Sequence, residues 1–171
     1  IVAMIGAGIV WRNAGGDHTF VRVIKSQGEV AVRSASSLHR GLTDGMHLNA
    51  HDAINTGPTG HVVLQLAIGR LALGSSSAMR IEHIAPHAVH LGLDRGAIAV
   101  HVPKENDAPK DLRINTSRAQ VRVVGTLFGV TNDASSTTIA VDDGLVDVAL
   151  PDGTHLGVPA GESLAIRDSG P

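Results

Sequence analysis

The chain has 171 residues, which is enough for one domain with a substantial core. A formal net charge of -2 argues against a protein that binds nucleic acid through a basic face, and one Trp, two Phe and no Tyr leave few rings on which bases or sugars could stack. The chain has no Cys, so disulfides, thiolate catalysis and Cys-ligated zinc are excluded.

The N-terminal segment, residues 1–11, is apolar throughout and ends at Trp11. A membrane-spanning helix needs about 20 apolar residues, so we predict that this segment is the C-terminal part of a membrane anchor. Trp11 would then lie at the lipid–water boundary, and the small polar residues 12–19 would form a linker. The alternatives are the apolar region of a signal peptide and a buried segment.

Gly6 and Gly8 imitate the start of a dinucleotide-binding fingerprint. That motif needs a third small residue at the place where this chain has Trp11, and it needs a parallel βαβ pattern that does not follow. Small residues within a membrane helix explain both glycines better.

Residues 20–168 alternate between aliphatic and polar side chains, which is typical of half-buried strands, and no helical stripe interrupts them. The alternating segments recur roughly every 8–12 residues, the spacing of all-β proteins. The aliphatic positions are Val30 and Val32; Val62, Leu64, Leu66 and Ile68, continuing with Leu71 and Leu73; Met79 and Ile81; Val89, Leu91 and Leu93; Ile98, Val100 and Val102; Leu112 and Ile114; Val121 and Val123; Ile139 and Val141; Val146, Val148 and Leu150; Leu156 and Val158; Leu164 and Ile166. We predict a β-helix-like stack or a β-sandwich of many short strands over residues 20–168, preceded by the end of a transmembrane helix.

Turns are predicted where Asp precedes Gly, at residues 44–45, 143–144 and 152–153, because Gly adopts positive φ freely. The clearest hairpin is predicted around residues 151–154. Residues 103–111 are charged and carry two prolines, so they are predicted to form a long loop.

Three of the ten His residues, His83, His87 and His90, have a spacing that on a helix would place them on one face, where they could hold a metal. Pro86 and the surrounding pattern indicate strand and turn instead, and on a strand His90 would point away from the other two. A second group close in sequence is His47, His51 and His61. For both groups a structural or solvated role is favoured.

Two other segments carry groups that could react. Residues 74–77 offer three Ser hydroxyls but lack the strand–elbow–helix context of a nucleophile. Asp142 and Asp143 are neighbours on a strand, so they would face opposite sides and would not form an acid/base pair. Turn formation explains both segments, and we predict no catalytic, metal or cofactor-binding residue and no enzyme activity.

One stretch resembles a known signature. Residues 112–116 (LRINT) and 121–130 (VRVVGTLFGV) look like the strand ending in Thr and the Val-x-Val-x-Gly-Thr-x-Phe-x-Val pattern of the FecR domain family. Residues 138–148 resemble its strand–Gly–strand unit and residues 159–162 its closing Ala-Gly-Glu, so that the resemblance extends over residues 28–162. The signature residues present are Thr116, Gly125, Thr126, Phe128, Val130, Gly144 and Gly161.

The signature is interpreted as structural. Gly125 permits a bulge or a close backbone approach, Thr126 can hydrogen-bond locally, and Phe128 is one of few large candidates for a core anchor. The chain departs from the family pattern at residues 68–70 (IGR for Asp-Gly-Ser) and 45–46 (GM for Gly-Asp). Both departures fall at predicted turns.

The resemblance implies the periplasmic sensor domain of a FecR-like anti-sigma factor anchored in the bacterial inner membrane. Such regulators hold an extracytoplasmic-function sigma factor through a cytoplasmic N-terminal segment. They receive a signal, by protein–protein contact, from a TonB-dependent outer-membrane transporter, often one for iron chelates. The alternative is a secreted or envelope-anchored FecR-domain module for binding or assembly that is not linked to transcription. Neither reading requires a cofactor or nucleic acid.

Overall fold

The computed structural model describes residues 21–34, 37–104, 110–123 and 125–168. These residues form sixteen β-strands and no helix, which confirms the predicted all-β class. The predicted membrane segment, residues 1–11, and the predicted linker, residues 12–19, lie outside the described residues. Within the described part, no helix is long and apolar enough to cross a membrane.

The strands form two sheets. The first sheet contains, in spatial order, β4 (His47–Leu48), β1 (Val21–Gln27), β6 (His61–Leu66), β7 (Gly69–Leu73), β9 (Ala88–His101), β12 (Leu127–Asn132), β13 (Ser136–Asp143) and β16 (Ser163–Arg167). The second sheet contains β3 (Ser37–Gly41), β2 (Val30–Ser34), β5 (Ala53–Thr56), β8 (Ala78–Ala85), β9 again, β10 (Asp111–Asn115), β11 (Gln120–Val123), β14 (Leu145–Ala149) and β15 (His155–Pro159). Neighbouring strands are antiparallel except β9 and β10.

Strand β9 belongs to both sheets and makes them continuous. Its first half pairs with β8 and β10 in the second sheet, and its second half pairs with β7 and β12 in the first. Gly96 stands where the strand crosses over, with φ of +93°, and a Cβ there would lie 2.0 Å from Ser77 Oγ. Only glycine fits this crossing, because it combines positive φ with a very close neighbour.

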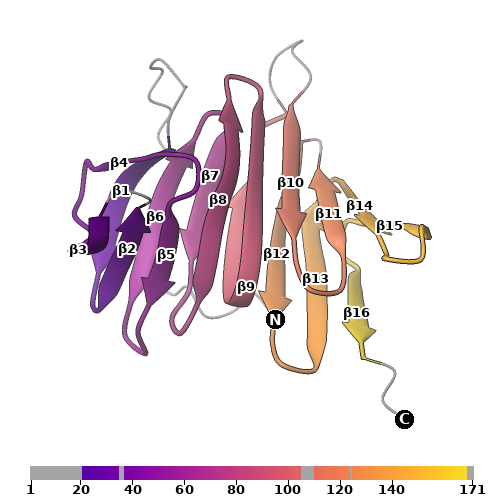
Figure 1. The fold of residues 1–171 in the computed structure, drawn as a ribbon. Helices are drawn as coiled ribbons and strands as arrows, with labels where there is room; N and C mark the ends of the chain where they lie inside the picture. Colours follow the sequence, from indigo (N-terminus) through magenta and orange to yellow (C-terminus); the bar gives the residue numbers. More distant parts are fainter. Residues whose placement is uncertain (1–20, 35–36, 105–109, 124, 169–171) are drawn as a thin grey trace.

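The hairpins β6–β7 and β12–β13 lie in the first sheet and β8–β9, β10–β11 and β14–β15 in the second, and from β5 onward the chain advances toward the β15–β16 end of the molecule in sequence order (Figure 1). The molecule therefore has the two packed layers of a sandwich and the serial progression of a β-helix-like stack. Each predicted architecture describes one of these properties.

The core lies between the sheets and consists almost entirely of aliphatic side chains. Along β12, Phe128 and Val130 are buried, whereas Leu127 and Gly129 face outward. The predicted alternation is confirmed along the other long strands as well. Each fully buried aliphatic side chain contributes roughly 1.5–3 kcal/mol, so the summed burial can hold together a domain with few aromatic residues.

The predicted turns are confirmed by the backbone. Gly45, Gly144 and Gly153 all have positive φ, at +82°, +91° and +86°. The turn at residues 67–68 also agrees with the position at which the chain departs from the family pattern. Of the long loop predicted at residues 103–111, residues 105–109 lie outside the described residues.

Two predicted strand boundaries are wrong. The run from Val62 to Leu73 is a hairpin of β6 and β7, because both strands direct alternate aliphatic residues into the same core and the pattern continues across the turn. Conversely, the segments predicted separately around Leu91 and Val100 belong to the single strand β9. The glycine at the crossover bends this strand without ending it.

Candidate functional site

A hollow of about 600 Å³ lies beside the start of β12, along the edge of the first sheet where its central strands begin or end. Cross-strand pairing brings its lining together from strands that are far apart in sequence, since Arg70 pairs with His101, His101 with Leu127, and Leu127 with Asp143. The hollow is lined by these four residues together with Gln65, Gly69, Val102, Pro103, Lys104 and Thr126.

The signature glycines shape the backbone around the hollow. Gly125 has φ of +66° two residues before the start of β12, and Gly144 has φ of +91° immediately after β13. A Cβ at Gly144 would lie 2.5 Å from Cγ2 of Thr126, so Gly144 allows the two segments to touch. Both positions therefore require glycine, for its conformation and, at Gly144, for its size.

Thr126 carries a polar group without a partner. The residue is 1% exposed, its carbonyl accepts a hydrogen bond from the Val102 amide at 2.8 Å, and its Oγ1 has no hydrogen-bond partner among the described residues. The prediction that the Thr126 side chain bonds locally is therefore not met here. A buried hydroxyl that makes no hydrogen bond loses its hydration without compensation, which is an uncommon arrangement in proteins.

Charged groups lie at the rim of the hollow. Lys104 Nζ contacts Asp143 Oδ2 at 2.8 Å, and Arg70 Nε donates to Gln65 Oε1 at 2.8 Å. The side chains of Lys104 and Asp143 are 62% and 59% exposed, so solvent screens their attraction. Both residues line the hollow, so this solvent-screened ion pair lies at its rim.

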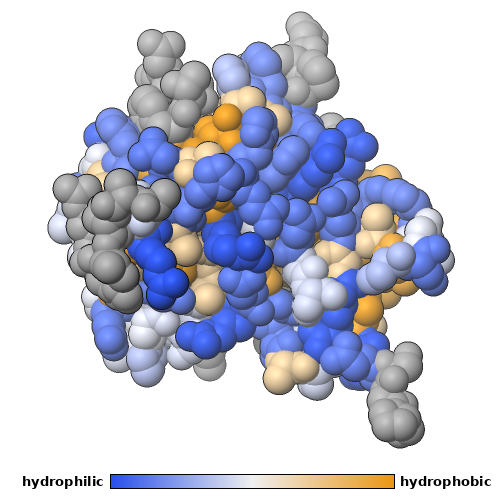
Figure 2. Space-filling view, viewed as in Figure 1, coloured by the Kyte–Doolittle hydropathy of each residue, from blue (hydrophilic) through white to orange (hydrophobic). Residues whose placement is uncertain are grey.

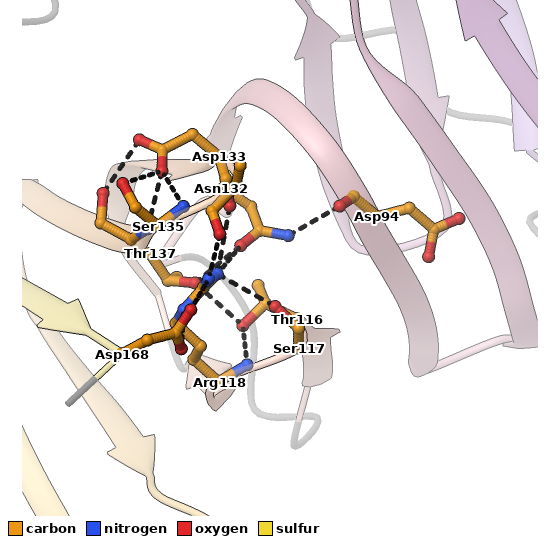
Figure 3. Close-up of polar contacts among 11 residues, drawn as sticks. Asp94, Thr116, Ser117, Arg118, Asn132, Asp133, Ser135, Thr137 and Asp168 are labelled. Carbon is orange, nitrogen blue, oxygen red and sulfur yellow. Dashed lines mark hydrogen bonds and ion pairs between the residues drawn. The ribbon is translucent and has the colours of Figure 1, made fainter. Parts of the chain in front are cut away.

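A fully bonded polar cluster lies at the opposite end of β12 (Figure 3). We call Thr116, Arg118, Asn132, Thr137 and Asp168 the clasp. Asn132 is 1% exposed, and its Nδ2 donates to the carbonyls of Leu93 and Asp94, both at 2.9 Å. Its Oδ1 accepts from Thr137 Oγ1 at 2.7 Å. This one side chain thereby joins β12, β13 and the crossover of β9.

Arg118 links the clasp to the second sheet. It lies in the turn between β10 and β11, and its guanidinium donates to Asn132 Oδ1 at 3.3 Å and to the carbonyl of Asp133 at 3.1 Å. Its Nε donates to Asp168 Oδ1 at 2.7 Å, and this hydrogen bond holds the pKa of Asp168 below its usual value. Thr116 Oγ1 accepts from the amides of Arg118 and Ala119, at 3.2 and 3.0 Å, which fixes the turn.

Asp133 closes the turn that follows Asn132. Its carboxylate accepts hydrogen bonds from the amides of Ser135 and Ser136 and from both hydroxyls, which lowers the pKa of Asp133 to about 2. A carboxylate that accepts several hydrogen bonds is favoured in its charged form. These contacts stabilise the turn between β12 and β13.

The His residues form a pair. His83 on β8 lies directly opposite His90 on β9, with ring centroids 5.1 Å apart, whereas His87 lies in the turn between the strands. The predicted arrangement, with His83 and His87 on one side and His90 on the other, is wrong because the chain reverses at residues 86–87. His90 Nε2 lies 3.3 Å from Asp111 Oδ2 on β10. In the described residues, no three His, Asp or Glu side chains are placed to hold a metal ion.

The remaining candidates are parts of turns or strand ends. Ser75 and Ser76 form a turn, and Ser77 is fully buried, with its Oγ accepting from the Ala97 amide at 3.1 Å. His47, His51 and His61 lie on β4, in a turn and on β6. Asp142 and Asp143 end β13, and both side chains are exposed.

The remaining signature residues are distributed along this region. Phe128 and Val130 are 1% and 0% exposed in the core, and Gly161 has φ of +82° in the turn between β15 and β16. The sequence did not predict the hollow, because its lining comes from five separate strands. It did not predict Asn132 either, although a lone Asn at the end of an aliphatic strand is a recognisable signal for a buried hydrogen bond.

Comparisons with known proteins identify the family. The model of the family described as "FecR protein" matches residues 52–147. The chain belongs to the FecR family. The matched range is shorter than the resemblance over residues 28–162, and it includes every signature residue except Gly161. No curated protein matches the chain.

Solved structures share this FecR fold. Two crystal structures of a candidate anti-sigma factor from Parabacteroides distasonis ATCC 8503 each match with a TM-score of 0.57 and 18% sequence identity. Each match covers 68% of this chain and 55% of the other. The chain thus spans about half the length of those structures, and at this identity the likeness concerns the fold.

Proposed function

We propose that this FecR domain is the periplasmic sensor part of a regulator that is anchored in the inner membrane and controls an extracytoplasmic-function sigma factor. The signal would arrive from a TonB-dependent outer-membrane transporter by protein–protein contact, without catalysis. The observation that carries the proposal is the family match over residues 52–147. The fold shared with a candidate anti-sigma factor supports it.

The C-terminal end of the molecule offers a place for such contact. Strands β15 and β16 are the last strands of their sheets, so among the described strands each pairs on one side only. Leu156, Leu164 and Ile166 on these strands are only partly buried, and Leu145 on the adjacent β14 is 59% exposed. Figure 2 shows hydrophobic residues among hydrophilic ones at this end. An unpaired strand edge with nearby aliphatic groups can accept a strand from a partner.

In-cell photo-crosslinking tests the proposal. A photoreactive residue is placed at Gly157 on β15 or at Ala165 on β16 in the complete native protein, and at Gly45 in a turn near the other end as a control. We expect the first two positions, but not the control, to crosslink to the signalling domain of a TonB-dependent transporter. A blocking substitution there should also abolish induction of the sigma-dependent promoter.

The opposite result has a clear form. Crosslinks to envelope assembly proteins, together with unchanged sigma-dependent transcription when the gene is deleted, would overturn the proposal. That outcome would support a secreted or envelope-anchored module that is not linked to transcription.

A further inference from the structure

The outer faces of the two sheets differ in charge. On the second sheet, Arg80 contacts Asp94 at 2.8 Å, and Arg113 contacts Asp111 at 2.8 Å. Figure 2 views the molecule from this side and shows mostly hydrophilic residues. Among the charged side chains described on its strands, Arg33, Arg80, Arg95, Arg113 and Arg122 are nearly balanced by Glu82, Asp94, Asp111 and Asp147. Most of these charges already have a partner within the sheet.

The outer face of the first sheet has a flat floor. One cross-strand row runs through Val63, Ala72, Ala99, Gly129 and Ala140, in that order. No side chain in this row is larger than Val, while the residues on either side of each in sequence point into the core. Ala72 is 7% exposed and the other four residues are partly buried, so five neighbouring strands present a shallow floor that small side chains of a partner could reach.

A second row, formed by the next outward-facing residues two positions along the same strands, carries longer side chains. It runs from Arg22 through Gln65, Arg70, His101 and Leu127 to Asp143. The hollow opens at the Leu127 end of this row, where Thr126 is buried with an unpartnered Oγ1. The two rows together form a trough with a small-residue floor and a wall of longer, mainly basic or polar side chains.

Cations outnumber anions on this face. Among the described residues on its strands it carries Arg22, Lys25, Arg70 and Arg167 against Asp142 and Asp143. Arg22 and Lys25 are exposed on β1 and make no ion pair with any acidic group in the described part of the chain. The local charge is positive although the whole chain is slightly negative, at -2. Such a patch attracts a ligand of opposite charge.

We propose that this trough binds an acidic segment of a partner protein, with carboxylates placed along the row from Arg22 to His101 and small side chains against the alanine floor. From β1 to β13 the trough crosses six strands, or roughly 24 Å at the usual spacing, which about 16 helical residues would span. A lipid surface fits less well, because binding at a membrane interface requires inserted apolar side chains. On β1 the only exposed large aliphatic is Ile24, which is 44% exposed. The proposal concerns a different face from the β15–β16 edge and does not depend on which protein delivers the signal.

Peptide titration of the isotope-labelled chain tests the trough by NMR. The probe is a helical peptide of about 16 residues in which Glu recurs every fourth position among Ala, so that the carboxylates line one face. The control peptide has Lys in place of Glu. We expect the Glu peptide alone to shift the amide signals of Ala72, Ala99 and Gly129, and we expect about 0.5 M salt to suppress the effect.

Charge reversal assigns the binding to this face. Arg22→Glu with Lys25→Glu should weaken binding of the Glu peptide roughly tenfold, the loss expected for two exposed ion pairs. Arg33→Glu is the matched control, because Arg33 is also exposed and has no ion-pair partner in the described residues, but it lies on the second sheet. The control should leave the affinity unchanged, and equal melting temperatures should show that all variants are folded.

Several results would overturn the proposal. These are unchanged affinity in the double variant, shifts confined to the second sheet, and no binding of the Glu peptide. Binding to phosphatidylglycerol vesicles in preference to the peptide would identify a membrane surface instead. A dimer in sedimentation velocity that the double variant dissociates would identify a second copy of the chain as the occupant.

Discussion

The buried polar side chains at the two ends of β12 differ in their hydrogen bonding. At one end Asn132 uses both its amide and its carbonyl oxygen in hydrogen bonds that join three strands and a turn. At the other end Thr126 is equally buried, but its hydroxyl has no partner among the described residues and a hollow lies beside it. Burial alone therefore does not show that a polar residue stabilises the fold. A buried polar group whose hydrogen bonds are made stabilises the fold, whereas a buried group without a partner leaves room for a ligand or for rearrangement.

The largest expected effect is at the centre of β12, between the two ends. Phe128→Ala removes the largest fully buried side chain, and we expect a loss of roughly 3–5 kcal/mol in the free energy of unfolding. Urea denaturation followed by circular dichroism measures it. An unchanged free energy of unfolding would contradict the burial of the ring in the core.

Asn132→Ala tests the clasp. It leaves two backbone carbonyls and the Thr137 hydroxyl without this partner, so we expect a loss of about 2–3 kcal/mol. Asn115→Ala is the matched control, because Asn115 is only partly buried on the outer face of the second sheet and donates to Glu82 at 2.6 Å. The control should change stability by about 0.5 kcal/mol. Equal effects of the two substitutions would show that the clasp has no special role.

Gly144→Ala tests the close contact between Gly144 and Thr126 beside the hollow. The new Cβ combines positive φ with a clash against Thr126, whereas Gly153→Ala meets positive φ alone, since nothing lies within 4 Å of its Cβ position. We expect about 2 kcal/mol of destabilisation for the first and about 1 kcal/mol for the second. If thermal denaturation ranked Gly153→Ala as the more harmful, the close approach of residues 126 and 144 would be refuted.

Two Thr→Val substitutions sharpen the comparison between the ends. Thr137→Val removes a hydroxyl that donates to Asn132, and we expect a loss of about 1–2 kcal/mol. Thr126→Val removes the unpartnered hydroxyl at nearly constant volume, so stability should change by less than about 0.5 kcal/mol or should rise. Chemical denaturation of both variants gives the difference. A large loss in Thr126→Val would reveal a hydrogen bond at the hollow.

The smallest expected effect is on the acid sensitivity of the turn beside the clasp. Folding lowers the pKa of Asp133 to about 2, so its stabilising contribution is complete above the unfolded pKa of about 3.9 and is lost as the pH falls toward 2. In Asp133→Asn the melting temperature should therefore fall less steeply below about pH 4 than in the wild type. If the melting temperatures of the two proteins fell equally with pH, the Asp133 carboxylate would contribute nothing to stability.

Local patterns in the sequence determined the strand content, the inward-facing residues and the turns. Alternation at Val146 and Val148 indicates a strand with one buried face, and Asp followed by Gly indicates a turn at residues 143–144 because of backbone sterics. The signature from residue 121 to residue 130 was also readable, and it led to the family that the comparisons confirm. Each of these features depends on residues that are close together in the chain.

The tertiary structure alone decided which strands are neighbours, because strand pairing depends on contacts between distant residues. The crossover at Gly96 places one strand in two sheets, and the hairpin at residues 86–87 brings His83 against His90. Alternation specifies which face of a strand is buried but not the identity or register of its partner. For this reason the hollow, the clasp and the alanine-lined trough could not be read from the sequence, since each is made from side chains that meet only after the sheets have formed.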